Sequence, residues 1–302
     1  AGAARTVVRN TQWQNAVALF ASGVAVNPAN QKLHAMLGDA LVKVGDHQSA
    51  ETCFRTALTL EPDDFKMHYS LAGALLAQGR MDAAEAAFQG SLFVGRAFSE
   101  TINGERFAAH VYNKLGDLQH ARNRSLAALQ SFQAAIKWAA RDDKQELFIA
   151  HFNLGTVYMH MQDYAGALQS FQDALRHAPS AAAAAQCLRD AAVVLMKTNR
   201  LEEAVHALQK AEGLVPDLPR VLSNMGLALH QLGRSEEAAQ TLLRAVRVEP
   251  GNANARVALG DVLFSQGEQY LALMHYKDAL QLDPSHLEAA SRFRRVQPNL
   301  EP

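Results

Sequence analysis

The sequence predicts an all-α protein in which helical hairpins are stacked into a solenoid. The main observation is an alanine that recurs eight times, at Ala16, Ala50, Ala84, Ala128, Ala167, Ala204, Ala238 and Ala272. A large apolar residue follows each alanine by four positions and a small residue by seven, which places all three on one helical face. Six of the eight alanines are followed twelve positions later by a proline, which ends the helix. The spacing is 34 residues at both ends of the chain, and such a period is typical of repeat proteins.

A first helix is predicted before each of these second helices. A large residue followed by a small one lies 12 to 13 positions before the alanine, as in Leu37-Gly38, Leu115-Gly116, Leu154-Gly155, Met225-Gly226 and Leu259-Gly260. A small residue between large ones allows two helices to pack closely. Gly or Asn follows most first helices, at Gly45, Gly79, Asn199, Gly233 and Gly267, and both residues suit the left-handed conformation that ends a helix. Each unit is therefore predicted to be an antiparallel helical hairpin.

These residues resemble the tetratricopeptide repeat family over most of the chain. The resemblance implies one right-handed α-solenoid over residues 1–302. We expect full repeats at 31–64, 65–98, 109–142, 148–181, 185–218, 219–252 and 253–286. A half repeat, consisting of the second helix only, is expected at 11–27, and a capping helix at 285–296. Because the chain begins with Ala1 rather than Met, we expect a fragment or a processed product.

Composition narrows the classes of partner and the compartment. A net charge of −1 and a pI near 7.0 argue against nucleic acid or an anionic membrane as the partner. No apolar run approaches the length of a membrane span. Cys53 and Cys187 lie in different repeats and are expected to be free thiols, which fits a cytoplasmic location. The absence of acidic residues before Asp39 leaves an organellar location as the alternative.

The middle of the chain departs from the regular period. The spacing of the repeat alanines rises to 44 and then 39 residues, and Arg96 and Ala140 stand where other units have proline. The first insertion, at about 99–108, is predicted to be a loop or a lengthened helix. In the second, Asp143 and Glu146 have the spacing of a capping box. Two explanations remain open, neutral drift in a loop or a change of superhelical pitch that shapes a binding surface.

Candidate binding residues lie on the first helices. In the tetratricopeptide family ligands usually bind the concave face that first helices form, so the resemblance implies a partner-binding set. The set is His110, Asn113, Lys114, Phe152, Asn153, His160, Arg189 and Asn224, and the same face carries Asp190, Arg220 and Asn254. Asn amides pair with a peptide backbone, and Arg pairs with carboxylates. The alternative is a polar face that only contacts solvent.

Signals for catalysis or for a specific ligand are weak. Some members of the family bind a partner's carboxylates through a two-carboxylate clamp of Lys, Asn and Arg on three successive first helices, and no three consecutive units match it. Others have an asparagine ladder, which is Asn at one recurring position of the repeat. The ladder position is occupied by Met36, Ser70, Lys114, Asn153, Asp190, Asn224 and Ala258. The twelve histidines show no metal-ligand spacing, and no catalytic triad order or phosphate-binding loop is present. We therefore expect no enzymatic activity, no cofactor, no metal and no small-molecule substrate.

The sequence favours a non-catalytic scaffold or adaptor that presents a concave groove to a peptide segment or a partner subunit. We expect a protein partner, with no nucleic acid and no membrane insertion. One alternative is a structural subunit built permanently into a large multiprotein assembly. A second alternative is a regulatory segment of a larger enzyme.

Overall fold

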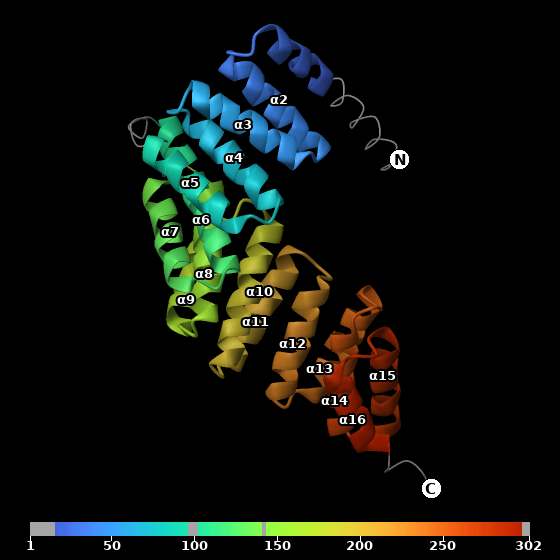
Figure 1. Ribbon diagram of the computed structural model, residues 1–302. Coiled ribbons are helices and arrows are strands. Elements are labelled where there is room, and N and C mark those ends of the chain that lie inside the picture. The colour runs from blue at the N-terminus through green and yellow to red at the C-terminus, as the bar shows by residue number, and fades with distance from the viewer. Residues whose placement is uncertain (1–15, 96–101, 141–142, 298–302) are drawn as a thin grey trace. The chain divides into compact units, whose positions relative to one another are not determined.

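The computed structural model describes residues 16–95, 102–140 and 143–297, and within these ranges it contains helices and no strand (Figure 1). The helices are α2 (Gln31–Val44), α3 (His47–Leu60), α4 (Phe65–Ala77), α5 (Met81–Gly95), α6 (Ile102–Ala121), α7 (Ser125–Trp138), α8 (Lys144–His160), α9 (Tyr164–Arg176), α10 (Ala181–Lys197), α11 (Leu201–Leu214), α12 (Pro219–Gln231), α13 (Ser235–Val248), α14 (Ala253–Ser265), α15 (Gln269–Leu282) and α16 (Leu287–Val296). Residues 16–26 are also helical. The prediction of an all-α fold is confirmed.

The chain forms two compact units, residues 1–146 and residues 147–302. In the first unit α2 packs on α3, α4 on α5 and α6 on α7, and the hairpins meet through α3 and α4 and through α5 and α6. In the second unit α10 packs on α11, α12 on α13 and α14 on α15, while α9, α11 and α13 each pack on the helix that follows. Helix α16 packs on α15. Each unit is thus a stack of hairpins that contact their neighbours along the chain, as in a solenoid.

First helices of successive hairpins also contact one another directly. Helix α2 touches α4, α10 touches α12, and α12 touches α14. Within each unit the first helices therefore lie side by side. This arrangement lets the side chains of several first helices contribute to one surface.

The predicted seam between the two helices of a hairpin is a small residue facing a large one. A Cβ atom at Gly38 would lie 2.5 Å from the ring of Phe54, and one at Gly226 would lie 2.4 Å from Leu242. The same arrangement recurs at Gly116 with Phe132, Gly155 with Phe171 and Gly260 with Tyr276. The recurring alanine from Ala50 to Ala272 is fully buried in every described hairpin. Close helix packing thus depends on the missing side chain of the first helix.

Turns inside the hairpins follow the sequence prediction. Gly45, Gly79, Gly233 and Gly267 have φ between 76° and 90°, a conformation that glycine adopts without strain. Asn123, Gln162 and Asn199 take φ near 60° at the equivalent turns. Side chains also cap the following helices, for example Asp46, whose carboxylate accepts a hydrogen bond from the Ser49 N–H at 3.0 Å.

The sequence predictions for the segments outside the regular repeats can be compared with the structure only in part. Residues 102–108 belong to the 20-residue helix α6, so this part of the first insertion is a lengthened helix, and residues 99–101 lie outside the described ranges. Helix α16 lies within residues 285–296, where the capping helix is expected, and residues 11–15 of the expected half repeat are not described. The bounds of the individual repeats stay predictions.

The two cysteines, Cys53 and Cys187, are free thiols. None of the described helices is long and apolar enough to cross a membrane.

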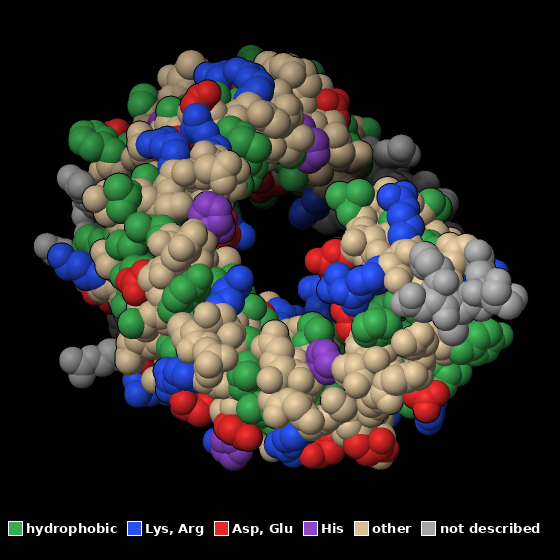
Figure 2. All heavy atoms as spheres, turned by 90° about the horizontal axis from the view of Figure 1, so that it is seen from below, with side chains coloured by type: hydrophobic (Ala, Val, Ile, Leu, Met, Phe, Trp, Pro, Cys, Tyr) green, Lys and Arg blue, Asp and Glu red, His purple; other side chains and the backbone are tan. Residues whose placement is uncertain are grey.

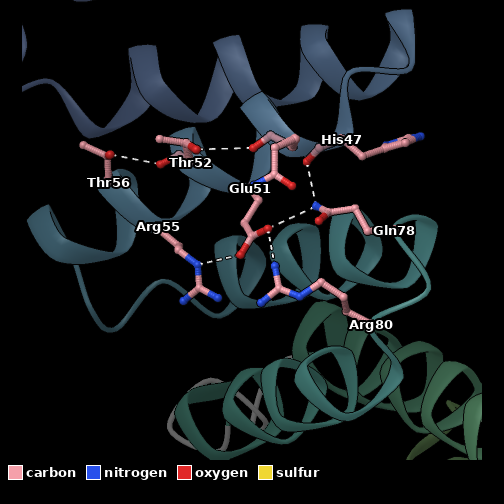
Figure 3. A network of polar contacts seen from close by, with 8 residues as sticks. His47, Glu51, Thr52, Arg55, Thr56, Gln78 and Arg80 are labelled. Carbon is pink, nitrogen blue, oxygen red and sulfur yellow. Dashed lines mark hydrogen bonds and ion pairs between the residues drawn. The ribbon is translucent and has the colours of Figure 1, made fainter.

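Buried carboxylates join successive hairpins in the first unit. Glu51 of α3 is 5% exposed and accepts hydrogen bonds from Arg55, Gln78 and Arg80 at 2.9, 3.1 and 2.7 Å (Figure 3). Gln78 and Arg80 belong to the turn of the next hairpin. Burial alone would raise the pKa of Glu51, but these hydrogen bonds outweigh it and hold the pKa below its usual value.

The same joint recurs in the following hairpin. Glu85, which lies 34 residues after Glu51, accepts hydrogen bonds from Gln119, Arg122 and Arg124 at 3.0, 2.7 and 2.6 Å. Removing one partner of a buried ion pair leaves an uncompensated charge, which is strongly destabilising. Both joints therefore favour the one arrangement of successive hairpins in which the carboxylate keeps its partners.

Phe171→Ala should destabilise the protein by about 3–5 kcal/mol, because Phe171 is 1% exposed and its loss leaves a cavity beside Gly155. Urea unfolding followed by circular dichroism measures this change. Phe93→Ala is the control, since Phe93 is 76% exposed, and a change within about 0.5 kcal/mol is expected. Equal losses in both variants would show that the assigned seam is wrong.

Two glycine substitutions in the first unit should have opposite effects. Gly38→Ala places a methyl group against Phe54, and such overpacking costs about 1–3 kcal/mol. Gly73→Ala in α4 meets no atom within 4 Å and should stabilise the helix by about 1 kcal/mol. Thermal unfolding of the two variants measures the difference. A stabilised Gly38→Ala variant would contradict the close approach of α2 and α3.

Acid stability should depend on Glu51. Its pKa is lower in the folded state, so the folded protein binds fewer protons and loses stability as the pH falls below the ordinary glutamate pKa of about 4.3. Glu51→Gln should therefore be less stable than the parent at pH 7, with a weaker further loss on acidification. Glu61→Gln, at an exposed position of the same unit, is the control. Urea unfolding at several pH values gives both slopes, and identical slopes for parent and Glu51→Gln would refute the assignment.

Candidate functional site

The described surface of the second unit contains two adjoining hollows along α10, α12 and the start of α14. The apolar hollow, of about 330 Å³, is lined by Ala182, Ala185, Gln186, Leu218, Pro219 and Val221. The polar hollow, of about 580 Å³, is lined by Asp190, Val193, Ser223, Asn224, Leu227, Gly251, Asn252, Ala253, Asn254 and Ala258. Arg189, Arg220 and Glu249 line both hollows. We call the two hollows together the α10–α14 groove.

Helical spacing explains how these residues reach one surface. On α12, Arg220, Asn224 and Leu227 are separated by four and three positions and so lie on one face. On α10, Gln186, Arg189 and Val193 are separated by three and four positions and also lie on one face. Since α10, α12 and α14 lie side by side in the second unit, their equivalent faces form a continuous groove.

Turn residues complete the groove. Pro219 opens α12 as its first helical residue, a position where the missing N–H costs nothing. Glu249 follows α13, and its carboxylate accepts a hydrogen bond from the side-chain amide of Asn252 at 2.7 Å. Asn252 in turn caps α14 by accepting from the Ala255 N–H at 3.0 Å. The turn before α14 is thereby fixed against the groove.

Charges in the groove are only partly paired. Arg189 donates to both carboxylate oxygens of Asp190, at 2.7 and 2.9 Å. Burial raises the pKa of Asp190, while the charges of Arg189 and Arg220 act in the opposite direction. Arg220 is exposed and forms no hydrogen bond or ion pair with any described residue. The first turn of a helix also disfavours a cation, so Arg220 remains open to an external carboxylate.

Two neutral polar groups of α12 also lack partners. The side-chain amide of Asn224 is half-buried and forms no hydrogen bond within the described part of the chain. The Ser223 hydroxyl oxygen is buried without a partner in those residues. Unpaired polar groups in a concave surface are costly unless a ligand or water satisfies them. The α10–α14 groove therefore offers one cation and one amide for recognition, whereas the Ser223 hydroxyl oxygen is buried beneath its surface.

His110 and Asn113, by contrast, are engaged inside the first unit. The amide of Asn113 donates to the side chain and the backbone carbonyl of Glu146 at 2.7 and 3.1 Å, and Asn113 is 2% exposed. His110 Nδ1 donates to the Glu146 carboxylate at 2.8 Å, and Nε2 is hydrogen-bonded to the Tyr69 hydroxyl at 2.8 Å. The expectation that Asn113 is available to a partner was wrong, because the inserted segment supplies its acceptor.

The contacts of Glu146 differ from those of the predicted capping box. Its N–H donates to the Asp143 carboxylate at 3.2 Å, as expected of a cap. Its own carboxylate binds His110 and Asn113. Burial would raise the pKa of Glu146, but the hydrogen bonds from these two side chains lower it below the usual value. Only half of the capping box forms, and Glu146 instead ties α8 to α6.

The remaining candidates are dispersed. Lys114 is exposed on α6, and His160 is exposed at the end of α8. Phe152 is half-buried against Phe148 and Phe171, with ring centroids 5.8 and 5.6 Å apart, so it serves packing. Asn153 is half-buried and has an interaction of its own. Of the eight predicted residues, the structure brings Arg189 and Asn224 together in one groove.

Helix periodicity alone could not identify every groove residue. Arg220 and Asn254 were expected on the first-helix face, and both line the groove. Glu249 and Asn252 were not expected, because they belong to the turn between hairpins. Leu218 and Pro219 likewise precede or open α12. Their only sequence signal was the proline that follows most of the second helices.

Metal-ligand chemistry and surface charge were the remaining indicators of a site. The described residues contain no cluster of three His, Cys, Asp or Glu side chains that could hold a metal ion. On the face shown in Figure 2, Lys and Arg alternate with Asp and Glu, and apolar side chains are interspersed among them. This mixed surface differs from the continuous basic patch of nucleic-acid-binding proteins.

Comparison with known sequences identifies related proteins. The chain is 25% identical over 133 residues to photosystem I assembly protein Ycf3 of Prochlorococcus marinus (strain NATL2A). The aligned residues cover 39% of this chain and 77% of that protein. It is 28% identical over 160 residues to the BBSome complex member BBS4 of Bos taurus, covering 51% of the chain and 29% of that protein. Protein O-mannosyl-transferase TMTC1 of Homo sapiens is 27% identical over 181 residues, which cover 58% of the chain and 20% of the transferase.

Solved structures share the fold. The C-terminal part of a TPR repeat-containing protein from Cytophaga hutchinsonii superimposes with a TM-score of 0.64 and 15% identity, covering 84% of this chain and 97% of that one. YrrB, described as a TPR protein with an unusual peptide-binding site, gives a TM-score of 0.50 and 22% identity, covering 66% of this chain and 99% of that one.

Family models agree with both comparisons. One tetratricopeptide repeat model matches residues 35–100, 189–247 and 223–286, and a second matches residues 146–217. Together with the seams of small and large residues, these matches show that the chain belongs to the tetratricopeptide repeat family.

Proposed function

We propose that this protein is a non-catalytic scaffold that binds a segment of another protein in the α10–α14 groove. The observation that supports this proposal most directly is that two groups in the groove are unpaired among the described residues, the Arg220 guanidinium and the Asn224 amide. An extended peptide presents backbone carbonyl and N–H groups at regular intervals, and a side-chain amide can pair with either of them whatever the sequence of the peptide.

Relatives support binding rather than catalysis. Ycf3 is named as an assembly protein, BBS4 as a member of a complex, and the solved protein YrrB as having a peptide-binding site. The match to the transferase TMTC1 covers a fifth of that enzyme. A regulatory segment of a larger enzyme therefore has less support than a scaffold.

A permanent structural subunit is the second candidate. It is favoured by the relationship to BBS4 and by apolar side chains exposed on second helices, such as Phe93, Leu126 and Leu243, at 76%, 69% and 41% exposure. Such a subunit would use these outer faces, whereas the scaffold uses the groove. The two candidates therefore differ in which surface a partner covers.

Asn224→Trp tests the groove. The indole fills the polar hollow, so the affinity for a partner should fall at least tenfold, which corresponds to about 1.4 kcal/mol. Thermal stability should change little, because Asn224 has no partner within the described chain. The partner is first identified by cross-linking and mass spectrometry with the parent protein, and the affinity is then measured by calorimetry.

Arg247→Trp is the matched control, because Arg247 is exposed on the second helix α13 and lines neither hollow. It should bind the partner like the parent protein. Loss of the partner in Arg247→Trp together with full binding by Asn224→Trp would refute the groove. Co-purification of the partner with the parent protein in a fixed stoichiometry would then favour the structural subunit.

A further inference from the structure

We infer that the α10–α14 groove selects a protein segment in which an aliphatic residue is flanked, within two positions, by an acidic residue on one side and a basic residue on the other. This inference rests on the proposed function and names the chemistry of the partner segment. Three observations carry it, and they concern the apolar hollow, Arg220 and Glu249.

The apolar hollow defines the aliphatic position. Its inner wall includes Ala185 and Val221, which are 0% and 1% exposed, and Leu218 and Pro219 lie at its rim. A hollow of about 330 Å³ is at the lower end of the range of ligand pockets, about 300–1,000 Å³. It suits one inserted side chain rather than a folded surface. Burying an aliphatic side chain there supplies the non-directional part of the affinity.

Arg220 defines the acidic position. Of the two arginines that line both hollows, Arg189 is already held by Asp190 through two hydrogen bonds. Arg220 has no such partner, and its planar guanidinium matches a carboxylate in a two-point contact. A basic residue at this position would be repelled, so Arg220 discriminates as well as attracts.

Glu249 defines the basic position. Its carboxylate is exposed and accepts a hydrogen bond only from the neutral amide of Asn252 among the described residues, so no cation neutralises it. Arg220 and Glu249 both line the two hollows, yet they form no ion pair with each other. A segment with both charges can pair with each of them while its aliphatic side chain fills the apolar hollow.

The size of the charge preference follows from exposure. Ion pairs between exposed side chains contribute about 0.2–1 kcal/mol. Each flanking charge should therefore change the affinity by a factor of about 1.4 to 5. The charges set which segment binds, whereas the aliphatic anchor sets how tightly.

An array of nine-residue synthetic peptides tests the inference with the purified full chain. The peptides have a serine and alanine background in which the central residue and the two positions on each side are varied. The parent protein should retain peptides with Leu, Ile, Val or Met at the centre, Asp or Glu on one side, and Lys or Arg on the other. The best peptide, labelled with fluorescein, then gives affinities by fluorescence anisotropy.

Three variants should each remove one preference. Arg220→Ala should lose only the acidic preference, and Glu249→Gln only the basic preference. Ala182→Trp fills the mouth of the apolar hollow from an exposed position and should lose the aliphatic preference. Arg247→Ala, at the exposed arginine outside the groove, should keep all three. Raising the salt from 50 to 500 mM should weaken the two charge preferences and leave the aliphatic one.

The outcomes separate this inference from the proposed function. If bound peptides are released by Asn224→Trp but carry no flanked aliphatic motif, the inference is overturned and the groove remains the binding site. An acidic preference that survives Arg220→Ala, or a basic one that survives Glu249→Gln, also overturns it. If no peptide is retained, or none depends on Asn224, the proposed function fails and the inference fails with it.

Discussion

The fold depends on one steric constraint, the meeting of a small residue of the first helix with a large residue of the second. Gly226 against Leu242 shows the closest approach, followed equally by Gly38 against Phe54 and Gly260 against Tyr276. No side chain larger than hydrogen fits at these positions without a shift. Because this contact recurs in successive hairpins, each hairpin has nearly the same geometry and can stack on the next. The seam thus fixes which helical face is buried and which remains on the first-helix surface.

Polar side chains on the surface formed by the first helices differ in whether they are hydrogen-bonded within the protein. In the first unit Asn113 and His110 bind Glu146, so their hydrogen-bonding capacity is used within the protein. In the second unit Arg220 and Asn224 have no partner among the described residues. A satisfied buried cluster holds helices together, whereas an unsatisfied one provides recognition groups. The surface suited to a partner is therefore the one where the protein itself supplies no acceptor or counter-ion.

The joints between hairpins also differ in chemistry. Glu51 and Glu85 follow the repeat alanine in the first unit, and each accepts several hydrogen bonds from the next hairpin. At the same position the second unit has Val205 and Ala239, which are 3% and 7% exposed. Apolar packing does not titrate, while a buried carboxylate with a lowered pKa links stability to pH. The joint at Glu51 therefore links stability to pH, whereas the apolar joints at Val205 and Ala239 do not.

The sequence by itself determined the helical hairpins and their seams, because these features depend on contacts within about one hairpin. It left the first insertion open as a loop or a lengthened helix, and the structure shows that residues 102–108 belong to α6. Offsets of four and seven residues are enough to place Ala167, Phe171 and Ala174 on one face. Only the tertiary structure decided which polar side chains remain available. Asn113 is engaged by a residue 33 positions away, and Glu249 reaches the groove from a turn. Hydrogen-bond partners from distant segments carry no periodic signal, so the candidate site could be predicted only in part.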